Sequence, residues 1–164
     1  MKTPIVDRDD NVICYKERAD IDYDKDIFRA ASLWITKSNG DVLLTQRKFT
    51  KKVDAGKWGE AVGGTVEGHD SYEDTIIREA AEELGLNDIK IQIGPKQFLQ
   101  TETYSVFVQW YTTCIDKDVS ELEIQEEEVE EALWMPVAEF KNDLTNNPKK
   151  YASDFIECVK LLEI

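Results

Sequence analysis

The sequence has few cysteines, one histidine and no long hydrophobic run. Its three cysteines, Cys14, Cys114 and Cys158, are far apart and lack metal-site spacing, so they predict reduced thiols in a cytoplasmic protein and exclude a disulfide framework. No apolar run approaches the roughly 18 residues that a membrane helix needs, and we expect no signal peptide. These absences predict a protein that acts without a membrane.

Positive charge is also scarce, since 20 Lys and Arg stand against 34 Asp and Glu and give a net charge of −14. A field of that sign repels polyanions, so we exclude a nucleic acid polymer and an anionic membrane surface as partners. It also repels a free polyphosphate, so a site for such a substrate must contain local cations. The length of 164 residues, the apolar fraction of 41% and the four Trp indicate one packed domain over residues 1–164.

The chain is organised around residues 63–86, which read GGTVEGHDSYEDTIIREAAEELGL. At 100° per residue, a helix here gathers an apolar stripe on one side, formed by Ile76, Ile77, Ala80, Ala81 and Leu84. Glu79, Glu82 and Glu83 share another sector, where each like-charge pair costs about 0.2–0.5 kcal/mol. A divalent cation such as Mg²⁺, which prefers oxygen ligands, reverses that cost. The alternative is a solvated acidic helix face.

The residues around this helix predict its boundaries. The glycine pair 63–64 follows two apolar residues and indicates a strand end where the backbone comes close to another group. Either Asp70 or Ser71 can cap the helix, and Gly85 ends it. A strand, a glycine-marked loop and a carboxylate-bearing helix are therefore expected in succession.

This stretch resembles the Nudix box of the Nudix hydrolase family, which spaces a glycine, an early glutamate, Arg-Glu, Glu-Glu and a closing glycine at fixed intervals. The matching residues are Gly64, Arg78, Glu79, Glu82, Glu83, Gly85 and Leu86. The sequence departs from the pattern at Asp70, where the family has Glu, and at His69, where it usually has Gly. The resemblance implies an α/β/α sandwich with a mixed sheet, to which this chain adds an N-terminal β-hairpin.

The resemblance also implies a metal site. Mg²⁺, or Mn²⁺ in its place, would be held by Glu79, Glu82 and Glu83. The backbone carbonyl of Gly63 would add a ligand, and Asp70 stands at the early acidic position.

Further roles follow from the family. Arg78 would orient Glu79 by an ion pair without touching substrate, and Glu79 is the first candidate for the catalytic base. Nudix enzymes often take one more catalytic or metal-binding acid from outside the box. The candidates here are Glu127 and Glu128, in the acidic segment 116–131.

Two residues before the box are candidates for substrate binding. Arg47 ends an expected strand, and its planar guanidinium suits phosphate oxygens, with an ordinary salt-bridged arginine as the alternative. Trp58 follows the polar loop 48–57 and can stack on a base, with a buried strand-end tryptophan as the alternative.

The remaining chain predicts further strands and helices. We expect a hairpin over residues 4–15, a charged surface connection over 16–26, a strand over 27–36, a turn at 38–41 and a strand over 42–47. After the box, strands are expected at 89–94, 98–102, 104–115 and 132–135. Pro136 opens a helix at its first position, which continues over 137–144, and a second amphipathic helix covers 148–162.

The implied activity is metal-dependent hydrolysis of a diphosphate bond in a nucleoside diphosphate linked to another moiety, by a monomer or homodimer. The alternative is a degenerate Nudix domain that binds a nucleotide or a protein and catalyses nothing. The layout from Gln46 to Trp58 also resembles isopentenyl-diphosphate isomerases and their hydrolase-like relatives. Those isomerases use Cys at the position of Gly63 and metal-binding His at Phe28 and Thr65, so the hydrolase-like branch is the closer match.

Overall fold

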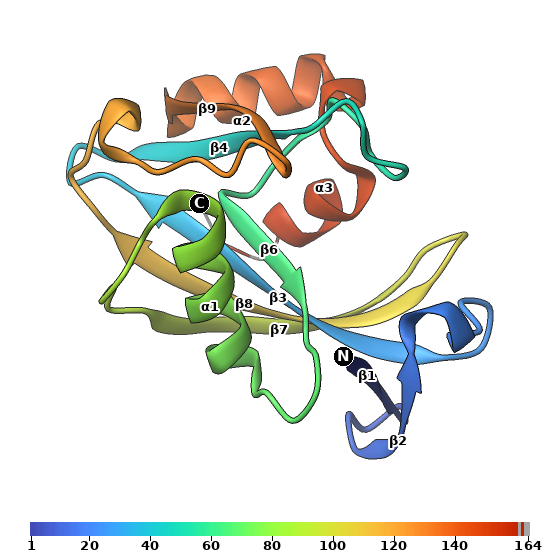
Figure 1. The fold of residues 1–164 in the computed structure, drawn as a ribbon. Coiled ribbons are helices and arrows are strands. Elements are labelled where there is room, and N and C mark those ends of the chain that lie inside the picture. The colour runs from blue at the N-terminus through green and yellow to red at the C-terminus, as the bar shows by residue number, and fades with distance from the viewer. Residues whose placement is uncertain (161, 163–164) are drawn as a thin grey trace.

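The computed structural model describes residues 1–160 and residue 162 (Figure 1). In this part of the chain nine strands form one mixed sheet: β1 Lys2–Val6, β2 Val12–Glu17, β3 Ile27–Thr36, β4 Asp41–Arg47, β5 Trp58–Gly59, β6 Val62–Thr65, β7 Gln92–Gln100, β8 Ser105–Cys114 and β9 Val129–Pro136. The α-helices are α1 Tyr72–Leu84, α2 Val137–Asn146 and α3 Ser153–Val159, and 3₁₀ turns cover η1 Arg18–Asp20, η2 Val119–Glu121 and η3 Pro148–Lys150.

Strand β3 is the centre of the sheet. One of its edges pairs in parallel with β8 along the whole strand. The other edge is shared in turn by β1 at Ile27, by β6 from Ala30 to Leu33 and by β4 at Thr36. Strand β4 then turns away to pair with β9 and β5, so β6 and the β4 group diverge from a common strand.

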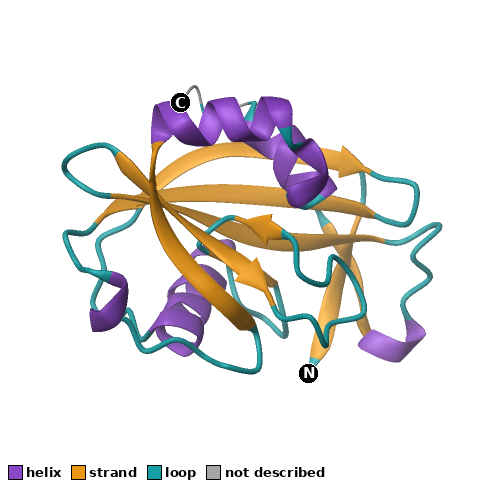
Figure 2. Cartoon of the chain, turned by 90° about the horizontal axis from the view of Figure 1, so that it is seen from above, coloured by secondary structure: helices purple, strands orange, loops and turns teal. Residues whose placement is uncertain are grey.

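Helices cover both faces of this sheet (Figures 1 and 2). Helix α1 packs on one face against Leu33 of β3, whereas α2 and α3 cover the opposite face around Trp34 of the same strand. The buried helix residues are Ile76, Ala80 and Leu84 of α1, Phe140 of α2, and Phe155 and Cys158 of α3. The α/β/α sandwich, the mixed sheet and the extra hairpin β1–β2 are all confirmed.

Residues at the two ends of helix α1 fix where it begins and ends. Ser71, not Asp70, is the N-cap: its hydroxyl accepts a hydrogen bond from the backbone N–H of Asp74 at 3.0 Å. The Asp74 carboxylate accepts one in return from the backbone N–H of Ser71, also at 3.0 Å. Gly85 closes the helix with a φ of 64°, a left-handed conformation that glycine adopts without strain.

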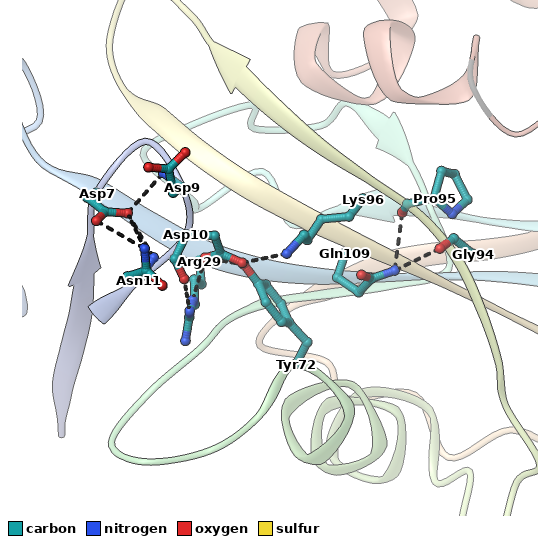
Figure 3. Close-up of polar contacts among 10 residues, drawn as sticks. All are labelled: Asp7, Asp9, Asp10, Asn11, Arg29, Tyr72, Gly94, Pro95, Lys96 and Gln109. Atoms are coloured by element: carbon teal, nitrogen blue, oxygen red, sulfur yellow. Dashed lines mark hydrogen bonds and ion pairs between the residues drawn. The ribbon is translucent and has the colours of Figure 1, made fainter. Parts of the chain in front are cut away.

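One continuous strand, β7, replaces the two short strands predicted at 89–94 and 98–102. Its pairing with β8 is interrupted by an irregularity at Gly94 and Pro95, which read as breakers in the sequence. There, Nε2 of Gln109 donates to the carbonyl of Gly94 at 2.9 Å and to that of Pro95 at 3.3 Å (Figure 3). A side chain therefore supplies the bonds that the ladder lacks at this point.

The helix predicted over 148–162 is also wrong. It is divided into η3 and α3 by an extended connection, and its residue 161 lies outside the described residues. The division arises because the backbone N–H of Ala152 donates to the carbonyl of Trp58 at 2.9 Å, a contact that a helix at this position would forbid. Tyr151 forms a parallel bridge to the same strand β5.

Three smaller details differ from expectation. Ile77 of the predicted stripe is 40% exposed, because α1 meets the sheet along the line from Ile76 to Leu84. Pro136 is the last residue of β9 and the N-cap of α2, not its first helical residue. Strand β9 starts at Val129, which pairs with Arg47, so two glutamates expected in the preceding loop belong to the strand.

No helix among the described residues is long and apolar enough to cross a membrane. The three cysteines are free; Cys14 and Cys114 are exposed, and Cys158 is buried in α3.

A shielded carboxylate fastens the N-terminal hairpin to the rest of the molecule. Asp10, in the hairpin turn, accepts hydrogen bonds from Nε of Arg29 at 2.7 Å, Nζ of Lys96 at 2.7 Å and the hydroxyl of Tyr72 at 3.0 Å (Figure 3). These donors belong to β3, β7 and α1. Burial of Asp10 opposes its ionisation, but the bonds from Lys96 and Arg29 outweigh that effect and lower the pKa of Asp10.

We expect Asp10→Asn to destabilise the protein by about 3 kcal/mol at neutral pH, because it leaves two cations without their anion. Asn tolerates the φ of 62° at this position, so backbone strain does not contribute. Because the folded pKa of Asp10 is lowered, its contribution is present above the ordinary value of 3.8 and is lost as the pH falls through the folded value. Urea unfolding of both proteins measures this difference, which should shrink below pH 3.8. Asp9→Asn changes an exposed neighbour, and an equal loss of stability there would contradict the assignment.

Candidate active site

The glycine pair of β6 lines a cavity of about 840 Å³. A Cβ on Gly64 would stand 2.6 Å from the carboxylate carbon of Glu79. One on Gly63 would stand 2.7 Å from Oε1 of Glu60. Successive residues of a strand face opposite ways, so the two carboxylates lie on opposite faces of β6. Glycine at both positions thus allows a carboxylate to rest against the backbone on each face.

The three glutamates of α1 line this cavity: Glu79, Glu82 and Glu83. Arg78 is not part of the cavity lining and pairs with two of them, Glu79 and Glu82. Its Nη1 is 2.9 Å from Oε1 of Glu79 and 3.5 Å from Oε2 of Glu82, and its Nε is 3.6 Å from Oδ2 of Asp70. The guanidinium therefore fixes acidic side chains without facing the space where a substrate would lie.

The electrostatics of the cavity disfavour ionised carboxylates. Burial, followed by the charges of Glu79, Glu128 and Glu60, raises the pKa of Glu83 to about 8. Burial raises the pKa of Glu79 as well, although its ion pair opposes this. Burial and then the charge of Asp154 raise the pKa of Glu60 to about 7. A bound cation would relieve this accumulation of negative charge.

The donor set fits a hard divalent cation in chemical type. Mg²⁺ and Mn²⁺ prefer carboxylate and carbonyl oxygens, and the cavity wall contains Gly63 and the three α1 glutamates. Within residues 1–160 and 162, no group of three His, Cys, Asp or Glu side chains is arranged to hold a metal ion. Glu79 faces Arg78 and Glu82 is 54% exposed, so both side chains would have to rotate to meet Glu83.

Three more of the predicted residues line the cavity: Arg47, Trp58 and Glu128. Nε of Arg47 donates to the carbonyl of Val53 at 2.9 Å, which ties β4 to the loop 48–57. Glu128 forms an ion pair with Lys51 of the same loop at 2.5 Å. Glu127 does not line the cavity, so Glu128 is the better placed of the two candidate acids.

Four cavity residues were not singled out by the sequence: Asp54, Glu60, Tyr104 and Asp154. The hydroxyl of Tyr104 donates to Oδ2 of Asp154 at 2.9 Å, and burial followed by the charge of Asp154 raises the pKa of Asp54. They come from the loop 48–57, the β5–β6 bend, the residue before β8 and α3, which only the fold brings together. The one available signal was a lone acid, Glu60, inside the small and apolar run WGEAVGG.

The two departures from the Nudix pattern lie beside the N-terminal hairpin. Nδ1 of His69 is 3.1 Å from the hydroxyl of Tyr15, and the two ring centroids are 4.9 Å apart. The backbone N–H of Gly68 donates to the carbonyl of Lys2 at 2.7 Å. Asp70 does not line the cavity. The hairpin therefore holds the loop that leads into α1.

The α/β/α sandwich and the carboxylate-bearing helix beside a glycine strand agree with the resemblance to the Nudix box. A family model of the NUDIX domain matches residues 26–155. The chain therefore belongs to the Nudix family, and it is a pyrophosphohydrolase.

Two curated relatives illustrate the range of the family. An uncharacterised Nudix hydrolase of Yersinia pestis is 25% identical over 157 residues, which cover 96% of this chain and 82% of that protein. An isopentenyl-diphosphate Delta-isomerase of Serratia proteamaculans is 24% identical, over 95% of this chain and 88% of its own.

Solved structures share the fold. DR0079 of Deinococcus radiodurans superposes with a TM-score of 0.85 at 19% identity, covering 100% of both chains. The NUDIX domain of Shewanella oneidensis NrtR, complexed with ADP ribose, gives a TM-score of 0.62 at 20% identity over 84% of this chain and 85% of that one.

We expect Gly64→Ala to reduce hydrolytic activity by about 100-fold, because the new Cβ would displace the Glu79 carboxylate by an ångström or more. Phosphate release measures the loss, and a thermal melt shows whether the fold is retained. The matched control is Gly59→Ala, whose Cβ would meet no heavy atom within 4 Å and which should keep activity within about twofold. Full activity of Gly64→Ala would contradict the importance of this contact.

Proposed function

We propose that this pyrophosphohydrolase is metal-dependent and cleaves the diphosphate bond of a nucleoside diphosphate linked to another moiety. The observation that carries the proposal is the convergence of the three α1 glutamates on one cavity, whose mutual repulsion a divalent cation would relieve. Arg47, Lys52 and Lys57 in the same wall support it, because phosphates need local positive charge in a chain of net charge −14. The ADP ribose in the NrtR complex supports the nucleotide part of the proposal.

The chain's own residues would divide the chemistry among them. Arg78 positions Glu79 through its ion pair. Glu79 is the first candidate to take the proton of the attacking water, with Glu83 as the second, since burial moves the pKa of both toward neutrality. Bound Mg²⁺, or Mn²⁺ in its place, would neutralise phosphate oxygens and lower the pKa of a bound water. As the water oxygen bonds to phosphorus, the bridging P–O bond breaks, giving a phosphomonoester and a second phosphate-bearing half.

Isomerase chemistry is not favoured at this site. The positions that carry the isomerase Cys and its two metal-binding His hold Gly63, Phe28 and Thr65. A side chain at Gly63 would also meet Oε1 of Glu60, which must then move. A binding module without turnover is the other alternative, and metal-dependent turnover separates it from an enzyme.

We expect phosphate release from a nucleoside diphosphate derivative with Mg²⁺ or Mn²⁺ and none with chelator. The panel includes isopentenyl diphosphate, whose double bond is followed to detect isomerisation. In Glu83→Gln the metal-dependent kcat should fall by more than about 100-fold. The loss should exceed that of a residue that only supports a metal ligand, because Glu83 is proposed to bind the metal itself. The thermal midpoint should not fall, because the change removes a buried carboxylate that resists ionisation.

The matched control is Glu73→Gln, on the exposed side of the same helix, which should keep activity. If the protein binds nucleotide but releases no phosphate with either metal, the hydrolytic proposal fails and the binding-module alternative stands.

A further inference from the structure

The cavity continues from the α1 carboxylates, past the β6 glycines, to a wall built from the α3 side of the sheet. This wall contains Tyr104, Trp110, Asp154, Phe155 and Cys158. Trp110, Phe155 and Cys158 belong to the core packed under α2 and α3, so this part of the cavity is mostly apolar and rigid. Its few polar groups therefore decide what it can receive.

Glu60 is the polar group at the boundary between the two regions. Its backbone carbonyl accepts a hydrogen bond from Oγ1 of Thr45 at 2.8 Å, and the next residue, Ala61, is fully buried. Its carboxylate accepts from Oγ of Ser32 at 3.0 Å and lies over Gly63. Backbone and side chain are thus both fixed, and the carboxylate keeps a defined position in the cavity wall.

No cation neutralises Glu60 directly. The ion pairs among the described residues do not include it, and one donor, Ser32, occupies one of its oxygens. The oxygens of Glu60 can therefore accept a further hydrogen bond from a ligand. A diphosphate held at the α1 glutamates would leave its organic half toward the apolar wall, with Glu60 at the boundary between the two.

A donor in the same wall is also without a strong acceptor. Nε1 of Trp110 is fully buried and has no hydrogen-bond partner in the described part of the chain. The group near enough to interact with it is the thiol of Cys158, a weak acceptor. Because this N–H is buried behind the cavity surface, the wall offers a ligand the acceptor oxygens of Glu60, which complement a hydroxyl or amino donor.

We propose that Glu60 is a specificity-determining residue, which accepts a hydrogen bond from the organic half of the substrate and selects diphosphates whose organic half carries hydroxyl or amino donors. The inference rests on the proposed diphosphate hydrolysis and adds the chemical class of the second moiety. It predicts that a diphosphate with a purely hydrocarbon half, such as isopentenyl diphosphate, is a poor substrate, because it would cover Glu60 without donating a hydrogen bond to it.

The test compares two probes that share the diphosphate and differ in donors, ADP-ribose and isopentenyl diphosphate, each with Mg²⁺. In Glu60→Gln, the KM for ADP-ribose should rise by about tenfold with kcat changed less than about twofold, because the hydrogen bond accepted by the carboxyl group is weakened outside the reacting centre. The kinetics of isopentenyl diphosphate should not change. Ser32→Ala removes the hydroxyl that positions the Glu60 carboxylate. It should lower the preference for ADP-ribose over isopentenyl diphosphate, as Glu60→Gln does, but by a smaller factor.

The matched control is Glu139→Gln, an exposed residue of α2, which should leave both probes unchanged. Equal changes for both probes, or a loss confined to kcat, would overturn the proposal and assign Glu60 to the chemistry. A lowered thermal midpoint of Glu60→Gln, with the ratio of kcat/KM for the two probes unchanged, would also overturn the proposal, since a structural role alone predicts that result.

The proposal can fail separately from the hydrolytic function. If the wild-type protein releases no phosphate, calorimetric titration with ADP-ribose and with isopentenyl diphosphate replaces kinetics. Tighter binding of ADP-ribose to the wild-type protein, weakened about tenfold in Glu60→Gln, supports the role of Glu60. Equal affinities of the two proteins for ADP-ribose would overturn it.

Discussion

Repulsion among carboxylates crowded around Gly63 and Gly64 is the constraint on which the site depends. Glu79 rests on one glycine and Glu60 on the other, so each face of β6 is occupied by a carboxyl group. In a chain of net charge −14, Arg78 of α1 offsets only part of this field. The N-cap, the buried line of α1 and the pairing of β6 with β3 hold these carboxyl groups in place. Burial first, and then the neighbouring carboxylates, raise the pKa of Glu83.

Much of the fold followed from local patterns, and its errors have a common physical cause. The strand 27–36, the caps of α1 and the N-terminal hairpin are set by residues close in sequence. The predictions for β7 and for the C-terminal helix were wrong because hydrogen bonds from residues distant in the sequence determine these elements. Gln109 repairs the ladder at Gly94, and the carbonyl of Trp58 draws Ala152 into an extended connection. Such tertiary hydrogen bonds leave no periodicity in the sequence.

The candidate site was likewise only partly predictable from the sequence. The box carboxylates could be predicted because a helix converts their spacing into a shared face. Glu60 and Asp154 could not, since a bend and a helix far apart in the chain bring them to one cavity. The choice between Glu127 and Glu128 also needed the fold, where Lys51 pairs with Glu128 beside the cavity. The spacing of residues in the sequence therefore does not predict the half of the site that would face the second moiety of a substrate.

The N-terminal hairpin contacts the box region, although the family model matches the chain only from residue 26 onward. It contacts the loop before α1 through Tyr15 and His69, and α1 itself through the bond from Tyr72 to Asp10. His69 is a departure from the box pattern, and its bulk is accommodated by packing against an element that the pattern does not include. Because the position of α1 aims its carboxylates, an element that touches none of them still determines where they point. The departure in the loop and the added hairpin are therefore in direct contact, and the hairpin packs where the box pattern differs.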